Sequence, residues 1–238
     1  MENNNTIYHK IFRTVKKVTP RPLAAFIRSG VTAFYTPVYF TFINGHFKSS
    51  FKNMSVTRQG DFLPWYTYPC IDFLRTRIFS DKTILEFGGG QSTLWWAAHS
   101  KKVVTIEDDK VWYEGLNKRI PVNVHLTHVP AESREKTVVE VNKLLTGLGD
   151  QSYDIVVIDG LCREQMIEIA YRVVSPNGAI ICDNAEGYEF YERFKEKGMQ
   201  RIDFFGHAPG VMLPHCTSVY FKEKCFLLDP HLPIPERM

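Results

Sequence analysis

The chain has 238 residues, of which 44% are apolar, and its formal net charge is only +3. That length holds one α/β domain with an extension, and that apolar content is enough for a sizeable core. The small net charge gives no indication of nucleic-acid binding. The five widely spaced cysteines include no Cys-x-x-Cys pair, which disfavours a metal-binding or disulfide framework. We therefore expect reduced thiols in a cytoplasmic protein.

The first third of the chain is basic and aromatic. Its early cations alternate with apolar residues and are Lys10, Arg13, Lys16, Lys17, Arg21 and Arg28. Such a segment can lie on an anionic surface, here the inner face of a membrane, or can dock on its own domain or on a second subunit. The apolar stretch 31–43 is too short to span a bilayer and contains Pro37, and the polar first residues do not resemble a cleavable signal. We predict that residues 1–65 form an extension that serves as a cap, a docking arm or an oligomerisation arm.

From residue 66 to residue 238, strands and helices alternate with the spacing of βαβ units. A helix over 68–79 leads into the first strand. Strands are predicted at 83–87, 103–107, 122–127, 153–158, 178–182, 200–206 and 215–222. Helices are predicted at 91–99, 110–119, 134–147, 163–173 and 188–197. Most central strands are short β-branched runs without strict alternation, which indicates burial on both faces. The prediction is an α/β, Rossmann-like, mostly parallel seven-stranded sheet with helices on both faces and an antiparallel last strand.

The most informative segment is the first strand with the turn that follows it, Thr-Ile-Leu-Glu-Phe-Gly-Gly-Gly at 83–90. Gly88, Gly89 and Gly90 lack a Cβ, so the chain can bend sharply there and let a ligand approach the backbone. A dinucleotide-binding turn would need a further glycine where Thr93 stands, and the acid Glu86 would repel a pyrophosphate. Glu107, at the end of the second strand, can accept both hydroxyls of a ribose.

The pattern Glu86-x-Gly-x-Gly, followed by Glu107 after the next strand, resembles the cofactor motifs of class I S-adenosylmethionine-dependent methyltransferases. The resemblance covers roughly residues 66–222 and implies that residues 66–238 form a methyltransferase domain. It implies that Glu107 holds the ribose and that Glu86, with the glycines, shapes the amino-acid end of the cofactor. Further contacts to the cofactor are expected from Ser92, Thr93, Asp108, Glu132 and Asp159. The aromatic residues Trp65, Tyr66 and Tyr68 are candidates for a roof over the pocket, and Trp95 and Trp96 are expected in the core.

A second set of polar residues follows strands four and five. Asp159 comes after strand four, and Asp183 and Asn184 come after strand five. Three oxygen ligands suit Mg²⁺, and the trio is similar to the metal site of catechol O-methyltransferase-like enzymes. The rival interpretation is that the two aspartates cap helices and contact cofactor or substrate directly.

The general base is not evident from the residues. The catechol enzymes have a lysine three residues after the first metal aspartate, whereas here Cys162 stands there, followed by Arg163. Because arginine stays protonated, Arg163 is expected to clamp a substrate or a carboxylate. His207 and His215 are the candidate bases, since imidazole titrates near neutral pH.

The predicted function is methyl transfer to a hydroxyl of a small molecule or glycan, with S-adenosylmethionine as cofactor and Mg²⁺ as a candidate metal. No nucleic-acid partner is expected, because the loop after strand four lacks the Asp-Pro-Pro-aromatic type of motif; a homo-oligomer is compatible with the extension. One alternative is an aminopropyltransferase, which would require an acidic residue at the position of Gln91. The other is a non-catalytic membrane-docking or scaffolding module that keeps the fold.

Overall fold

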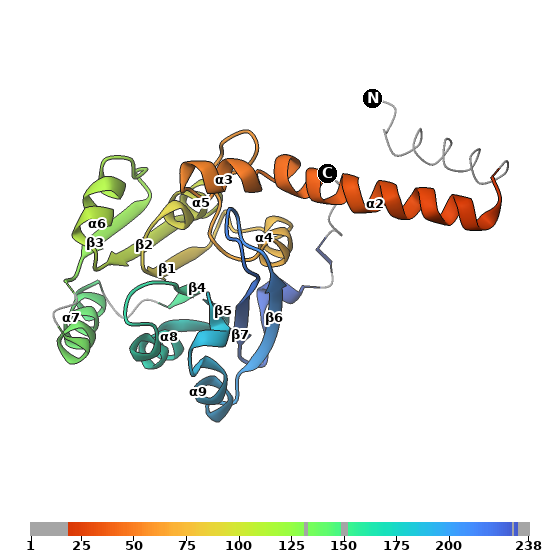
Figure 1. The fold of residues 1–238 in the computed structure, drawn as a ribbon. Coiled ribbons are helices and arrows are strands. Elements are labelled where there is room, and N and C mark those ends of the chain that lie inside the picture. Colours follow the sequence, from red (N-terminus) through yellow and green to blue (C-terminus); the bar gives the residue numbers. More distant parts are fainter. Residues whose placement is uncertain (1–18, 131–132, 149–151, 230, 233–238) are drawn as a thin grey trace.

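The computed structural model describes residues 19–130, 133–148, 152–229 and 231–232, and these contain a single seven-stranded sheet (Figure 1). The strands are β1 (Thr83–Phe87), β2 (Lys102–Glu107), β3 (Val124–His128), β4 (Tyr153–Ile158), β5 (Val174–Cys182), β6 (Gln200–Gly206) and β7 (His215–Phe221). Their order is β3-β2-β1-β4-β5-β7-β6. Strands β1 to β5 are parallel, and β7 pairs antiparallel with both β5 and β6. The predicted fold class, with its reversed last strand, is confirmed.

Helices cover both faces of this sheet (Figure 1). They are α4 (Tyr68–Arg75), α5 (Gln91–His99), α6 (Lys110–Asn117), α7 (Arg134–Gly147), α8 (Met166–Val173) and α9 (Phe190–Glu196). Adjacent residues of β1 belong to different cores: Ile84 packs with residues of α4 and α5, and Leu85 packs with residues of α7, α8 and α9. Both side chains are fully buried, as the lack of alternation predicted.

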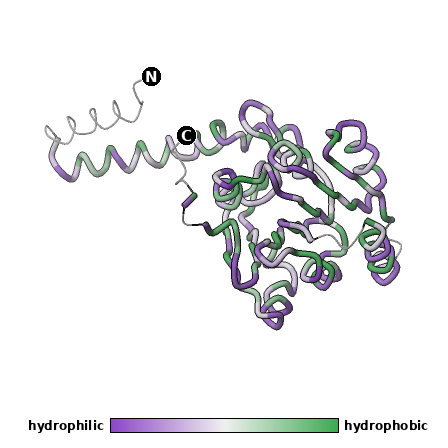
Figure 2. The backbone as a smooth tube through the Cα atoms, turned by 180° about the vertical axis from the view of Figure 1, so that it is seen from behind, coloured by the Kyte–Doolittle hydropathy of each residue, from purple (hydrophilic) through white to green (hydrophobic). Residues whose placement is uncertain are grey.

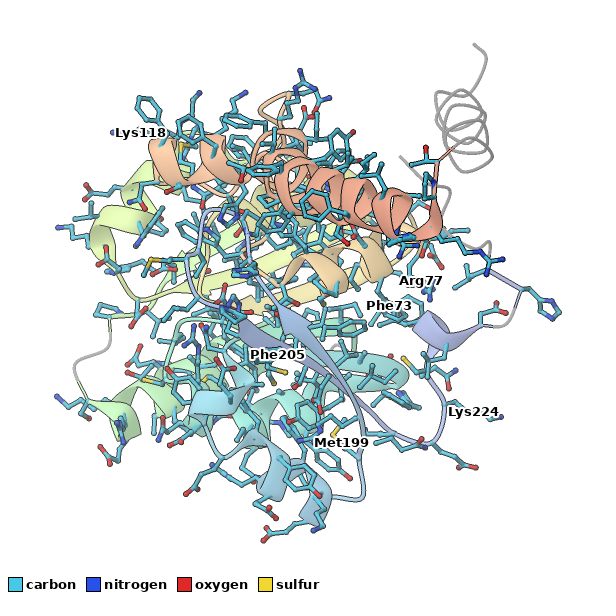
Figure 3. All side chains as sticks on the ribbon, turned by 45° about the vertical axis from the view of Figure 1, so that its right-hand side comes forward. Phe73, Arg77, Lys118, Met199, Phe205 and Lys224 are labelled. Carbon is cyan, nitrogen blue, oxygen red and sulfur yellow. The ribbon has the colours of Figure 1, made fainter. Side chains whose placement is uncertain are left out.

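Packing within the core follows the sequence prediction in most places. Trp96 is fully buried and Trp95 nearly so, as expected. The rings of Phe73 of α4 and Phe204 of β6 pack with their centres 5.0 Å apart and their planes tilted by 37°. The Arg77 guanidinium lies 4.2 Å from the centre of the Phe73 ring (Figure 3). All five cysteines are free thiols.

Most element ends agree with the prediction within two residues, and the largest differences are at three places. Helix α4 stops at Arg75 instead of 79, where the Arg77 N–H donates to the Leu74 carbonyl and tightens the chain into a turn. Strand β5 begins earlier, at Val174, because Val174 pairs with Tyr153 across a register shift. The helix predicted over 163–173 is a 3-10 turn, η1 (Arg163–Gln165), followed by α8.

The region before the sheet is more regular than its composition indicates. It contains the 23-residue helix α2 (Arg21–Ile43), which continues through Pro37, and the short helix α3 (His46–Lys52). Helix α2 extends away from the body (Figure 1). Among the described residues, no helix combines the length and the apolar character needed to cross a bilayer.

Candidate active site

The site begins where β1 ends. Gly88 has φ +95°, and a Cβ there would lie 2.4 Å from the backbone nitrogen of Gly160, which follows β4. Glycine is therefore required by both the backbone angle and the close approach of two main chains. The β1 and β4 ends are also where the chain connections diverge to opposite sides of the sheet, which is the usual ligand position in open α/β sheets.

A cavity of about 260 Å³ opens at this point. Its walls come from the glycine turn, the start of α5, the end of β2, the start of α6 and the β4 end. The lining residues are Trp65, Gly88, Gly89, Gly90, Gln91, Ser92, Glu107, Asp108, Asp109, Trp112, Asp159 and Gly160. The sequence prediction thus placed seven residues on this wall as cofactor contacts: Gly88, Gly89, Gly90, Ser92, Glu107, Asp108 and Asp159.

Glu107 is held by the main chain and not by a cation. One carboxyl oxygen, Oε2, accepts from the Gly89 N–H, and the other, Oε1, accepts from the Asp109 N–H at 2.8 Å. Burial raises the pKa of this carboxyl group, while both N–H donors lower it. Because each carboxylate oxygen has two acceptor positions, each keeps one for a further donor. A pair of neighbouring hydroxyls matches that arrangement.

Glu86 has a different position from the one expected. Its carboxyl group is fully buried, does not line the cavity, and accepts from the hydroxyls of Thr93 and Thr105 at Oε2. Burial raises its pKa to about 8, with the hydroxyl donors opposing that rise. The Thr93 hydroxyl also accepts from the Gly90 N–H, so Glu86 fixes the glycine turn from behind.

The start of α5 offers groups for the amino-acid end of a ligand. Gln91 is 4% exposed and lines the cavity, and its Oε1 has no hydrogen-bond partner within the described chain. A Cβ on Gly90 would meet nothing within 4 Å, so the turn leaves open space at its outer side. The first turn of a helix also leaves backbone N–H groups without helical partners. An acceptor for an ammonium group and donors for a carboxylate therefore lie together, which fits the cofactor that the resemblance implies.

On the other side of the cavity, Asp159 is paired with a cation. Its Oδ1 lies 3.0 Å from a terminal nitrogen of Arg163, and the other terminal nitrogen of that arginine donates to the Tyr188 hydroxyl at 2.8 Å. Burial and the nearby Asp183 carboxylate raise the pKa of Asp159 to about 7, whereas Arg163 lowers it. Arg163 is thus a clamp on a carboxylate, in agreement with one of the two roles expected of it.

Asp183 and His215 form a second, deeper pair. The Asp183 Oδ1 accepts from the Thr217 hydroxyl at 2.8 Å and lies 3.5 Å from Nε2 of His215. That separation is long for a hydrogen bond but short enough for an ion pair when the imidazole is protonated. The interaction with Asp183 raises the pKa of His215, and burial opposes it. Thr217 also accepts from the Thr67 N–H, which ties this pair to the segment before α4.

The predicted metal trio does not present a free set of oxygen ligands. Asp159 already faces the Arg163 guanidinium and Asp183 faces the His215 imidazole, and Asn184 has a left-handed backbone at the start of the turn η2 (Ala185–Gly187). Nor does the described part of the chain bring together three or more His, Cys, Asp or Glu side chains in a way that could hold a metal ion. Mg²⁺ would have to displace Arg163 from Asp159, so the trio does not fit the ion in this arrangement. Magnesium use remains a prediction.

Several other predicted residues lie away from the cavity. His207 packs against Phe40 of α2 and His46 of α3, with ring centres 5.6 and 6.2 Å away. It therefore contacts the extension. His215 contacts Asp183 and does not line the cavity. Glu132 lies outside the described residues. Of the aromatic roof candidates, Trp65 lines the cavity and its indole N–H donates to Pro209, whereas Tyr66 and Tyr68 are buried.

Four lining residues were not predicted as ligand contacts: Gln91, Asp109, Trp112 and Gly160. Gln91 was used only to argue against an aminopropyltransferase, although it directly follows the third glycine. Trp112 stands five residues after Glu107 in the first turn of α6 and is 42% exposed. Its position near the end of β2 is the signal that could have indicated it.

No protein-family model matches the chain, and no curated protein matches its sequence. Solved structures do resemble it. A methyltransferase from Pyrococcus furiosus is 17% identical, with a TM-score of 0.49 over 80% of this chain and 98% of that one. A methyltransferase from Geobacter sulfurreducens is 14% identical, with a TM-score of 0.46 over 90% and 97%. An rRNA methylase from Streptococcus thermophilus is 14% identical, with a TM-score of 0.45 over 66% and 96%. At these levels of similarity no conclusion about activity follows, and the fold assignment rests on the strand order.

Proposed function

We propose that the chain transfers a methyl group from S-adenosylmethionine to a hydroxyl oxygen of a small molecule or glycan. The observation that carries this proposal is the Glu107 carboxylate, which lines the cavity beside the glycine turn and accepts one main-chain hydrogen bond at each oxygen, so that each oxygen has a second acceptor position. A ribose with neighbouring hydroxyls fills both positions. Gln91 and the first turn of α5 then receive the amino-acid end, and Trp112 supplies an apolar wall for the base.

When bound, the cofactor supplies a methyl group whose carbon–sulfur bond breaks as the acceptor oxygen bonds to the carbon, leaving the electron pair on sulfur. The residues of this chain must then hold the acceptor and receive its proton. Asp159 is suited to the proton, because it lines the cavity and its pKa of about 7 lies near physiological pH. Its Oδ1 faces Arg163, so Oδ2 is the oxygen left for the acceptor hydroxyl.

Arg163 and Tyr188 act through Asp159. The arginine stays protonated, lowers the pKa of the aspartate against the effect of the nearby Asp183, and fixes the orientation of the carboxylate. Tyr188 holds the other arm of the guanidinium group. In this scheme the cation that balances the two acids belongs to the protein, and we assign no step to a metal.

The proposal is tested by calorimetry with the purified chain. We expect S-adenosylmethionine and S-adenosylhomocysteine to bind, and decarboxylated S-adenosylmethionine to bind more weakly because it lacks the carboxylate that meets the start of α5. Preference for the decarboxylated form would favour aminopropyl transfer instead. Incubation with a panel of hydroxylated acceptors, followed by mass spectrometry, should show a gain of one methyl group. If none of the three cofactor forms binds, the proposal is wrong.

A further inference from the structure

Helix α2 carries an apolar face that nothing in the described chain covers. The face consists of residues spaced by three or four positions: Leu23, Ile27, Val31, Phe34, Val38 and Phe42. These side chains are between 42% and 81% exposed, and α2 contains no buried residue. Ser29, Thr32 and Thr36 form a polar group on the opposite side of the helix, next to Phe40, whose ring packs against Tyr68 of α4. Arg28 lies at the flank between the two sides, as do the exposed Phe26 and Tyr35. Figure 2 shows the alternation of apolar and polar residues along this projecting helix. An exposed apolar face of this length indicates a binding surface.

The apolar face continues onto α3. The rings of Phe42 and Phe47 lie 5.5 Å apart, and those of Phe47 and Phe51 lie 6.2 Å apart and stacked. Phe47 is 53% exposed and Phe51 is 81% exposed. We call the apolar face of α2 together with Phe47 and Phe51 the aromatic strip. The aromatic strip thus continues beyond α2 onto α3, at the body of the protein.

The α3 end of the strip is fixed to the body near the cavity. The Gly210 N–H donates to Nδ1 of His46, and a Cβ on Gly210 would lie 2.5 Å from the Ser50 nitrogen, so the loop after β6 packs directly on α3. The same loop holds Trp65 of the cavity wall through the Pro209 carbonyl. It also exposes Met212 and Leu213, which are 81% and 67% exposed. The apolar surface therefore extends to the loop that supports the cavity.

The segment of sequence that contains the strip carries charge of one sign. Of the 29 lysines and arginines in the chain, nine lie within residues 3–60, where there is no Asp or Glu. The 20 remaining cations are outnumbered by 25 acids between residues 61 and 238. The extension is therefore strongly basic although the whole chain is nearly neutral. Clustered cations beside an apolar helix face are attracted to anionic lipid headgroups.

We propose that the aromatic strip docks on the surface of an anionic lipid bilayer, with α2 lying in the plane of the interface. The aromatic rings enter the boundary between headgroups and acyl chains, while Arg28 and the cations of α3 remain among the headgroups. A second copy of the chain fits the strip less well. Two α2 helices packed on their apolar faces would bring only cations together, without an acid on either helix to pair with them.

The test is flotation of the full-length chain with two kinds of vesicle, one of pure phosphatidylcholine and one with about one third phosphatidylglycerol. We expect binding to the anionic vesicles alone, and weaker binding as salt is raised. The variant Phe34→Ala should lower the partition coefficient roughly tenfold, because Phe34 is 81% exposed and its ring would be buried in lipid. The matched variant Thr36→Ala, on the polar side of the same helix, should bind as the unmodified chain does.

The exposure of both side chains makes unfolding an improbable reason for any loss, and circular dichroism checks that each variant keeps its helices. Failure of the unmodified chain to float with anionic vesicles would overturn the proposal. Equal losses from the two variants would do so as well, because the apolar face would then have no special role. Light scattering that shows Phe34→Ala converting a dimer into a monomer, with no vesicle binding by either form, would assign the strip to a second copy of the chain.

Discussion

The two halves of the candidate site balance their acids in different ways. In the half formed by β1 and β2, Glu86 is held by threonine hydroxyls and Glu107 by backbone N–H groups. In the half formed by β4 and β5, Asp159 faces Arg163 and Asp183 faces His215. The carboxylates of the first half are thus fixed by hydroxyl and main-chain donors, and the second half holds paired ionisable groups. We interpret the first as the cofactor half and the second as the acceptor half.

The largest expected effect comes from removing the ribose acceptor. Glu107→Ala deletes two hydrogen bonds from hydroxyls to a carboxylate, each worth about 1.5–3 kcal/mol, and the affinity for S-adenosylmethionine should fall by roughly two orders of magnitude or more. Calorimetry measures this. The control Glu114→Gln removes an exposed acid from α6, within the same region, and should leave the Kd unchanged. Equal affinity of Glu107→Ala and the unmodified chain would remove the cofactor half from the interpretation.

A second prediction concerns pH and Glu86. Its folded-state pKa of about 8 lies above the ordinary value of 4.5, so the unfolded chain loses this proton first as the pH rises. This group therefore lowers the free energy of unfolding by up to about 1.4 kcal/mol for each pH unit between those two values. In Glu86→Gln, whose amide oxygen can still accept from Thr93 and Thr105, that decline should disappear. Urea unfolding at several pH values measures it, and an unchanged pH dependence would show that Glu86 is ionised in the fold.

The sequence predicted the cofactor half of the site better than the acceptor half. The cofactor half lies within residues 83–112, where a strand, three glycines and two acids are separated by short, fixed distances, so local patterns were informative. The acceptor half depends on contacts across long stretches of sequence: Tyr188 with Arg163, and Thr217 with Asp183. The residues led us to expect that Arg163 clamps a substrate or a carboxylate, but they did not identify Asp159 as that carboxylate, and Asp159 was also predicted as a metal ligand. The acceptor itself remains a proposal for the same reason.

The extension shows another limit of local patterns. Gly45, Asn53 and Gly60 are residue types that favour chain breaks, and all three have positive φ; Gly45 and Asn53 bound the short helix α3. Residues 21–43 nevertheless form one continuous helix through Pro37, which the sequence reasoning did not predict. A proline removes one backbone donor, but the remaining hydrogen bonds of a long helix can outweigh that cost. The interpretation of residues 1–65 as one functional arm stays a prediction.

Substitutions at two glycines of the turn distinguish an effect on folding from an effect on ligand binding. Gly88→Ala would place a methyl group against the Gly160 main chain at a left-handed backbone angle, so we expect a loss of roughly 2–4 kcal/mol in the free energy of unfolding. Gly90→Ala meets no atom within 4 Å and has an extended φ of 178°, which any residue adopts. It should leave stability nearly unchanged and weaken cofactor binding by narrowing the cavity. Thermal unfolding and calorimetry distinguish the two, and a stable Gly88→Ala variant would contradict the close packing of β1 and β4.

The smallest expected effect is a shift in a pH profile. Arg163 lowers the pKa of Asp159, so in Arg163→Met that pKa should rise further above its ordinary value. If Asp159 accepts the acceptor proton, kcat/KM increases with pH as the carboxylate ionises, and the midpoint of this increase should move to higher pH by about one unit in the variant. The control Arg172→Met removes an exposed arginine of α8 that bonds to Asn142, away from the cavity. An unshifted midpoint, with a lower maximum rate, would mean that Arg163 positions the acceptor directly. Asp159 would then be a structural anion beside it, and the cation of the acceptor half would be the group that recognises the substrate.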